Sequence, residues 1–167
     1  DLDVLVEDAK LGIEYHGLCC HGGDEKRKDH IWKTQQMNEK GYDLIQIFED
    51  EWRDKRDIVK GIISARLGVF AKKFQARKLR LDNVDSKTAR EFLDANHIQG
   101  AINGAHYGLF DGPELISVVT IGKSRFKNKE SAWELLRYVT KIGCSVTGGF
   151  DRLIKESLRS RENMITY

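Results

Sequence analysis

The sequence predicts an α/β protein made of a mixed sheet flanked by helices and a second, α+β unit. Strand and helix patterns alternate over the first 70 residues, and new patterns begin beyond residue 80. Between them, residues 72–80 carry five basic side chains in nine. We therefore expect a first domain at residues 1–71, a basic linker at 72–80 and a second domain at 81–167.

The first domain is expected to begin with a β-hairpin. Residues 2–6 alternate in the manner of a strand, and a polar turn leads to a second strand at 11–15. A charged helix is expected over 24–40, before an apolar strand at 42–48 that fits a central strand, buried on both faces and parallel to its neighbour. Apolar residues then recur at helical spacing over 51–67, which predicts one amphipathic helix.

The second domain is expected to mix short helices with strands. Its turn and helix signals are spaced closely enough for one compact α+β unit. We expect, in order, a strand at 79–81, a helix at 86–96, strands at 107–110 and 115–121 around the turn Asp111-Gly112-Pro113, a strand or buried helix at 133–140, and a helix from 150 to about 158.

Composition excludes some classes of protein. The 167 residues are 40% hydrophobic, enough to bury a core, and no apolar run approaches the ~20 residues that span a bilayer. No signal-peptide pattern is present, and three cysteines make a poor disulfide framework. These features predict a soluble cytoplasmic protein with no membrane partner. Because the chain begins at Asp1 without a methionine, we expect it to be part of a longer one.

Acidic residues on the predicted hairpin form a candidate metal site. Asp3 and Glu14 lie on adjacent strands, where cross-strand neighbours come within ~5 Å of each other. Such a pair is close enough to share one Mg²⁺ through side chains and waters, with the Tyr15 backbone carbonyl as a further ligand. A divalent cation of this kind polarises a phosphodiester and so favours its hydrolysis.

Three of the five histidines lie within fifteen residues of one another, close to these acids. His21, in a glycine-flanked loop, is placed to activate a water as general base. His16 or His30 is placed to orient that base or to protonate the leaving group, and Glu14 belongs to the same catalytic cluster. Solvated or structural roles for each residue remain the alternative.

A zinc site is a second interpretation of the same segment. Cys19, Cys20, His21 and His30 form a four-ligand set of the right chemistry. Adjacent cysteines at the end of a strand point to opposite sides, however, and the usual C-x₂-C spacing is absent. We therefore expect Cys19 and Cys20 to belong to the core.

The first 70 residues resemble a known nuclease family. The motifs are L-D, then I-E-Y-H-G-L-x-x-H, then H-x-x-K, and then G-Y-x-L-I-Q-I-F-E-D-E-W. This pattern resembles phage homing endonucleases related to the very-short-patch-repair (Vsr-like) endonucleases, within the PD-(D/E)XK-like superfamily. The resemblance implies a Mg²⁺-dependent endonuclease that cuts double-stranded DNA in the host cytoplasm, with Mn²⁺ as a substitute cation.

The resemblance also implies roles for single residues. Asp3 matches the metal-binding aspartate, and His21 matches the histidine that activates water. His16 matches a second active-site position that varies among relatives. His30 falls where repair-type relatives carry a supporting aspartate. Lys33, one turn after His30, is placed on the same side of the helix to hold a phosphate.

Further motifs in residues 77–167 are F-L-D-A-N-H-I-Q-G and G-L-F-D-G-P-E-L-I-S-V-V-T-I-G-K. With them, this region resembles the C-terminal region of such phage proteins. The segment V-T-G-G-F-D-R-L-I-K is similar to the phosphate-cradling strand, loop and helix of a GNAT-like acetyltransferase fold. The family's fuller glycine pattern is lacking, so the domain is expected to help bind DNA. The basic residues expected to contact phosphates are Arg77, Lys78, Arg80, Lys123, Arg125 and Lys127.

Two other functions stay open at this point. A nuclease-like domain without activity would serve as a DNA-binding or assembly module. The second domain would instead be an enzyme if it transferred acetyl groups or modified DNA. The joint presence of Asp3, Glu14 and His21 favours an active nuclease, because a charged site costs stability to maintain.

Overall fold

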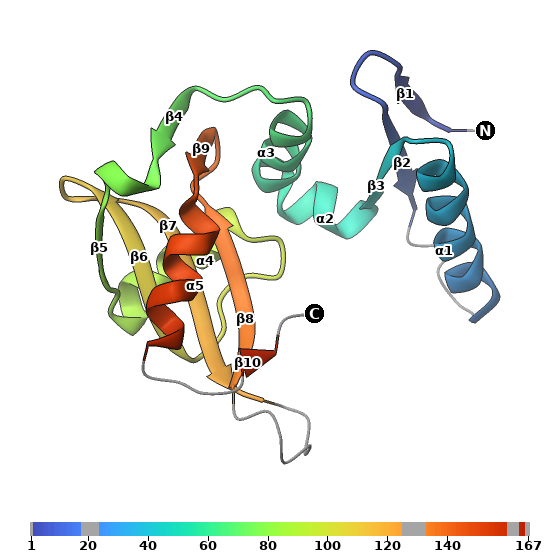
Figure 1. Ribbon diagram of the computed structural model, residues 1–167. Helices are drawn as coiled ribbons and strands as arrows, with labels where there is room; N and C mark the ends of the chain where they lie inside the picture. Colours follow the sequence, from blue (N-terminus) through green and yellow to red (C-terminus); the bar gives the residue numbers. More distant parts are fainter. Residues whose placement is uncertain (1, 18–23, 125–132, 160–163, 166–167) are drawn as a thin grey trace. The chain divides into compact units, whose positions relative to one another are not determined.

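The structure is a computed structural model that describes residues 2–17, 24–124, 133–159 and 164–165. The chain forms two compact units, Asp1–Val69 and Phe70–Tyr167 (Figure 1). Each unit combines helices with β-sheet, which confirms the predicted α/β class. Within the described ranges, no helix is long and apolar enough to cross a membrane.

The first unit contains a three-stranded mixed sheet in the order β1-β2-β3. β1 (Val4–Val6) and β2 (Leu11–His16) form the predicted antiparallel hairpin. After β2, helix α1 (Asp24–Glu39) leads to β3 (Asp43–Phe48), which pairs with β2 in parallel, as predicted. β2 is therefore the central strand, with β1 along one edge and β3 along the other. The expectation of a central strand buried on both faces at 42–48 is thus wrong: β3 is an edge strand of this sheet and only Ile47 in it is buried, because an apolar run alone does not specify how many neighbours a strand has.

The prediction of a single helix over 51–67 is wrong, because the chain forms two helices there. α2 (Glu49–Asp54) ends at Lys55, whose φ of −133° and ψ of 36° lie outside the helical region, and α3 (Arg56–Arg66) follows. The first helix starts early because the Glu51 carboxylate accepts a hydrogen bond from the Phe48 backbone N–H at 3.3 Å. Periodicity alone did not reveal the break, since Trp52 and Val59, seven residues apart, keep a helical spacing across it.

The second unit is built on a five-stranded sheet in the order β10-β8-β7-β6-β5. The pairs are antiparallel except for β10 with β8. The strands are β5 (Arg80–Asn83), β6 (Ala105–Asp111), β7 (Glu114–Lys123), β8 (Trp133–Thr140) and β10 (Met164–Ile165). Residues 133–140 thus form a strand, which decides between the two alternatives left open for that segment.

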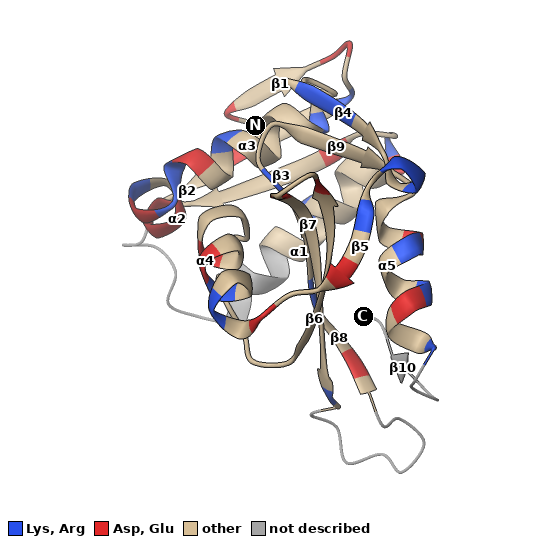
Figure 2. Ribbon diagram, turned by 90° about the vertical axis from the view of Figure 1, so that its left-hand side faces the viewer, with Lys and Arg blue, Asp and Glu red and all other residues tan. Residues whose placement is uncertain are grey.

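Helices cover both faces of this sheet, as Figures 1 and 2 show. α4 (Ser86–Asn96) packs Ala89 against Val118 of β7, and α5 (Gly149–Leu158) packs Leu153 against Val119 of the same strand. Successive residues of a strand point to opposite faces, so the two helices lie on opposite sides. β7 is consequently the most deeply buried strand of the unit.

The segment expected to be a basic linker, residues 72–80, instead belongs to the second unit. It forms strand β4 (Lys72–Gln75), the 3₁₀ helix η2 (Ala76–Lys78) and the start of β5. β4 pairs in parallel with β9 (Cys144–Thr147). The basic side chains are therefore carried by ordered elements. The prediction of a linker failed because exposed faces of strands can carry as many charges as a linker does.

Candidate active site

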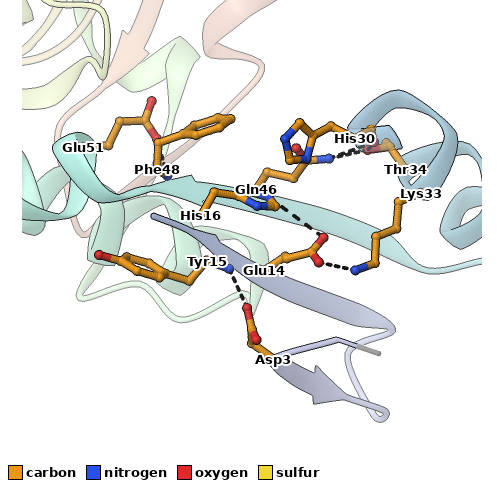
Figure 3. A network of polar contacts seen from close by, with 10 residues as sticks. All are labelled: Asp3, Glu14, Tyr15, His16, His30, Lys33, Thr34, Gln46, Phe48 and Glu51. Atoms are coloured by element: carbon orange, nitrogen blue, oxygen red, sulfur yellow. Dashed lines mark hydrogen bonds and ion pairs between the residues drawn. The ribbon is translucent and has the colours of Figure 1, made fainter. Parts of the chain in front are cut away.

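β2 and α1 position the polar cluster of the first unit. Glu14 and His16 are two residues apart on β2, so their side chains lie on the same face, and α1 crosses that face (Figure 3). Each of the two side chains is only 12% exposed. Two ionisable groups are thus largely shielded from water. Such burial of ionisable groups is found in catalytic sites and also in structural ion pairs.

The Glu14 carboxylate lies between a cation and an imidazole. Lys33 of α1 donates a hydrogen bond from Nζ to Glu14 Oε1. The other oxygen, Oε2, is 3.9 Å from His16 Nε2 and accepts no hydrogen bond from the residues that the structure describes. One Glu14 oxygen is therefore neutralised, and the other faces His16.

His30 brings a second imidazole to the same place. Its ring meets the His16 ring edge-on, with 4.2 Å between the centroids and 71° between the planes. Phe48 of β3 borders both rings, at 5.3 Å from His16 and 6.1 Å from His30. Sequence reasoning placed His16 and His30 in one cluster, and the structure places their rings in contact.

Gln46 and Thr34 fix the middle of α1 against β3, although sequence reasoning did not identify either as part of the site. Gln46 Nε2 donates to the His30 carbonyl at 3.0 Å and to Thr34 Oγ1 at 2.8 Å (Figure 3). The Thr34 hydroxyl donates to the same carbonyl at 2.9 Å. The available signal was a glutamine inside the otherwise apolar pattern L-I-Q-I-F, because a polar residue at such a position needs a partner.

Asp3 lies at the opposite edge of β2 from β3. Asp3 directly precedes the first residue of β1. Its Oδ2 accepts a hydrogen bond from the Tyr15 backbone N–H at 2.7 Å. In an antiparallel ladder, the N–H and C=O of one residue face the same neighbouring strand. The Tyr15 carbonyl therefore faces the edge where Asp3 lies, and the two residues offer a carboxylate and a carbonyl oxygen there.

These two oxygens suit Mg²⁺, which usually binds one or two carboxylates and keeps several waters. Among the described residues, no group of three or more His, Cys, Asp or Glu side chains has the geometry to hold a metal. A cage made wholly of protein ligands is thus not found in that part of the chain. The Glu14 carboxylate, the other predicted ligand, is bonded to Lys33.

Several predicted residues lie outside the described part of the chain. These are His21, Cys19 and Cys20 in the first unit, and Arg125 and Lys127 in the second. The assignment of His21 as general base and the zinc interpretation both stay predictions. Lys33, predicted to bind a phosphate, contacts Glu14, and its role toward DNA also stays a prediction.

The other basic residues are spread over several elements of the second unit. Arg77 and Lys78 are exposed on η2, and Lys123 is exposed at the end of β7. Arg80 on β5 pairs with Asp82 and lies 4.5 Å above the Phe110 ring. Two further cations of α5, Arg152 and Lys155, were not singled out from the sequence, although they lie beside Arg77 in a groove.

The candidate site thus consists of an acidic edge at Asp3 and Tyr15, and an inner cluster of Glu14, His16, His30 and Lys33. The second unit, taken by itself, carries the exposed basic side chains described above. Comparison of the chain with protein-family models, with curated proteins and with solved structures found no match.

Proposed function

We propose that the first unit is a Mg²⁺-dependent endonuclease that hydrolyses phosphodiester bonds of double-stranded DNA. The observation that carries this proposal is the Asp3 carboxylate beside the Tyr15 peptide, at the residue next to His16. Oxygen ligands for a hard cation and an imidazole for proton transfer are the two groups that metal-assisted phosphodiester hydrolysis needs. The sequence resemblance to Vsr-like homing endonucleases supports the same assignment.

Asp3 and the Tyr15 carbonyl are the proposed holders of the cation. Bound there, Mg²⁺ would polarise the phosphodiester and offset its negative charge. Asp3 Oδ2 accepts the hydrogen bond from the Tyr15 N–H, so Oδ1 is the oxygen proposed to bind the cation. The Asp3 side chain is exposed, so a DNA phosphate and waters have access to it. Mn²⁺ prefers similar oxygen ligands and is expected to substitute.

The inner cluster is proposed to carry out proton transfer. Glu14 Oε2, at 3.9 Å from His16 Nε2, is placed to orient the imidazole. The edge-on contact with His30 restricts the rotation of the same ring. His16, at the end of β2, would then hold or deliver a proton at the scissile bond, and His21 would activate the water as the family resemblance implies. Lys33 fixes the Glu14 carboxylate from the other side.

The finer fold assignment belongs to the same proposal. A sheet of β1, β2 and β3 with α1 against it is compatible with the core of a Vsr-like, PD-(D/E)XK-like nuclease. For the second unit we propose a role in positioning DNA, on a GNAT-like scaffold without acetyl transfer. Its exposed basic residues support a polyanionic partner.

The test is cleavage of supercoiled plasmid DNA carrying a library of candidate target sites, in Mg²⁺, Mn²⁺ or EDTA. We expect nicked or linear products that require the cation, are absent with Asp3→Asn and His21→Ala, and persist with Asp8→Asn. Asp8 is a matched control because it is an exposed aspartate of the same hairpin. DNA that binds the protein but stays intact under all conditions would favour the non-enzymatic binding module.

A further inference from the structure

A groove with a volume of about 730 Å³ lies on the second unit between η2 and α5. One wall is formed by the chain around η2, and the other by the loop before α5 and the first turns of that helix. The lining includes Ala76, Arg77, Gly148, Asp151, Arg152 and Lys155. None of these residues belongs to the candidate site of the first unit.

Arg152 holds the two walls together. Its Nη1 donates hydrogen bonds to the carbonyls of Ala76 and of Leu79, the latter at 2.7 Å. These bonds join α5 to a segment more than 70 residues earlier in the chain. They leave Arg77 of η2 and Lys155 of α5 on the same groove, both exposed. The cations therefore converge through a fixed tertiary contact.

The positive charge continues along α5. Arg152, Lys155 and Arg159 follow one another at three and four residues, so they share one face of the helix. A second hollow of about 370 Å³ is lined by these three cations together with Leu81 and Glu156. Figure 2 shows the blue bands along α5 and the blue turn before β5. Four cations thus outnumber the two acids, Asp151 and Glu156, that line the two hollows, and one of the four, Arg159, pairs with Glu156 at 2.7 Å.

The N-terminus of α5 adds a positive partial charge to the groove. Gly148 lines the groove with a left-handed φ of 73°, and no side chain caps the helix there. Backbone N–H groups of a first helical turn favour anions. The helix terminus thus adds to the positive potential that the side-chain cations create in the groove.

The lining favours an extended polyanion over a compact ligand. Sites for nucleotides or coenzymes usually have apolar and aromatic walls that enclose the ligand. Among the described residues that line the two hollows none is aromatic, and the cations are spread along the length of α5. A backbone of successive phosphates matches a row of separated cations.

We propose that this groove binds the sugar-phosphate backbone of double-stranded DNA, with Arg77, Lys155 and Arg159 as phosphate contacts and Arg152 as the positioning residue. The proposal rests on the proposed function only in taking DNA as the polyanion. It gives the second unit a defined track, made by α5 and η2, for DNA that the first unit would cut.

The test is binding of a labelled random-sequence duplex to the whole chain, measured by fluorescence anisotropy in EDTA over a range of salt concentrations. Each lost phosphate contact is expected to lower the slope of log K against log[salt] by about one, which weakens binding about eightfold at 0.1 M salt. We therefore expect Arg77→Ala and Lys155→Ala to lower the slope by about one each, and the double variant by about two.

The matched controls are Arg90→Ala and Lys87→Ala, exposed cations of α4 that line neither hollow. They should leave the slope unchanged, and thermal unfolding should confirm that all variants fold. If the double variant had the same slope of log K against log[salt] as the wild type, the proposal would be overturned. Saturable binding of a mononucleotide or coenzyme A in the groove, abolished by the same substitutions, would also overturn it in favour of a compact ligand.

Cleavage is scored separately in Mg²⁺, so the two proposals fail in different ways. If the groove variants lose DNA affinity but the wild type never cuts, the nuclease assignment fails and the groove stands. If the wild type cuts and the groove variants bind and cut normally, the groove proposal fails and the nuclease assignment stands.

Discussion

The Asp3 carboxylate takes the place of a main-chain partner for Tyr15. The register of β1 with β2 pairs Val4 with Ile13, so a longer β1 would bring Leu2 opposite Tyr15. Instead, Asp3 Oδ2 accepts the Tyr15 N–H at 2.7 Å. The same carboxylate thus ends the hairpin ladder and lies beside the carbonyl proposed to bind the cation.

Asp3→Asn is expected to separate these two roles. The amide oxygen still accepts the Tyr15 N–H, so the hairpin should persist, whereas the loss of charge should weaken Mn²⁺ binding at least about tenfold. Electron paramagnetic resonance of free Mn²⁺ measures the affinity without any DNA target. Asp8→Asn is the control, and equal affinities for Asp3→Asn and the wild type would rule out Asp3 as a ligand.

Lys33→Met is expected to lower the free energy of unfolding by about 1 kcal/mol, because it leaves the 12% exposed Glu14 carboxylate without its cation. Adding Glu14→Gln to this variant should recover most of the loss. Urea unfolding of a Trp133→Phe background reports on the first unit through Trp32 and Trp52. Arg53→Ala, which breaks an exposed pair with Asp54, should change nothing measurable.

His106 is expected to make the second unit less stable in mild acid. It is 6% exposed on β6, with Nδ1 at 2.9 Å from Thr120 Oγ1, and burial lowers its pKa from 6.5. Below pH 6.5 the unfolded chain therefore binds more protons than the folded one, and the free energy of unfolding falls as the pH falls. Above that pH the stability is fully present.

The measurement is urea unfolding at pH 7.5 and 5.5, followed by Trp133 fluorescence in a Trp32→Phe, Trp52→Phe background. His106→Gln should show a smaller difference between the two pH values than the wild type shows. An equal difference in both proteins would assign the acid sensitivity to other groups.

Asn96→Ala is expected to destabilise the second unit by about 1 kcal/mol. Asn96 Oδ1 accepts the Ile142 N–H and Nδ2 donates to the Phe92 carbonyl, both at 2.8 Å, so the side chain ties the end of α4 to the turn after β8. Exposed Asn103→Ala is the control, measured by the same Trp133 unfolding.

Local patterns predicted most of the elements correctly. The hairpin, the parallel pairing of β3, the turn between β6 and β7, and helix α4 follow from spacing and turn residues that act over a few positions. Asp85 accepts hydrogen bonds from the backbone N–H groups of Lys87 and Thr88, and this cap starts α4 at the predicted Ser86.

Features that depend on long-range pairing were harder to predict. The parallel partner of β4 is β9, far along the chain, so residues 72–80 looked like a linker when taken alone. The Lys33 contact with Glu14 and the Gln46 contacts with Thr34 and the His30 carbonyl likewise join separate elements. Sequence spacing identified the histidines and acids as a group, but it did not specify which oxygen faces which nitrogen.

The pairing of β4 with β9 has a consequence during synthesis of the chain. β4 leaves the ribosome on the order of 70 residues before its partner, and non-local pairing of this kind forms slowly. In that interval β4 is an unpaired edge. Its exposed lysines, Lys72 and Lys73, disfavour pairing with strands of other chains. We therefore expect the charge that made this segment resemble a linker also to disfavour aggregation of the nascent chain.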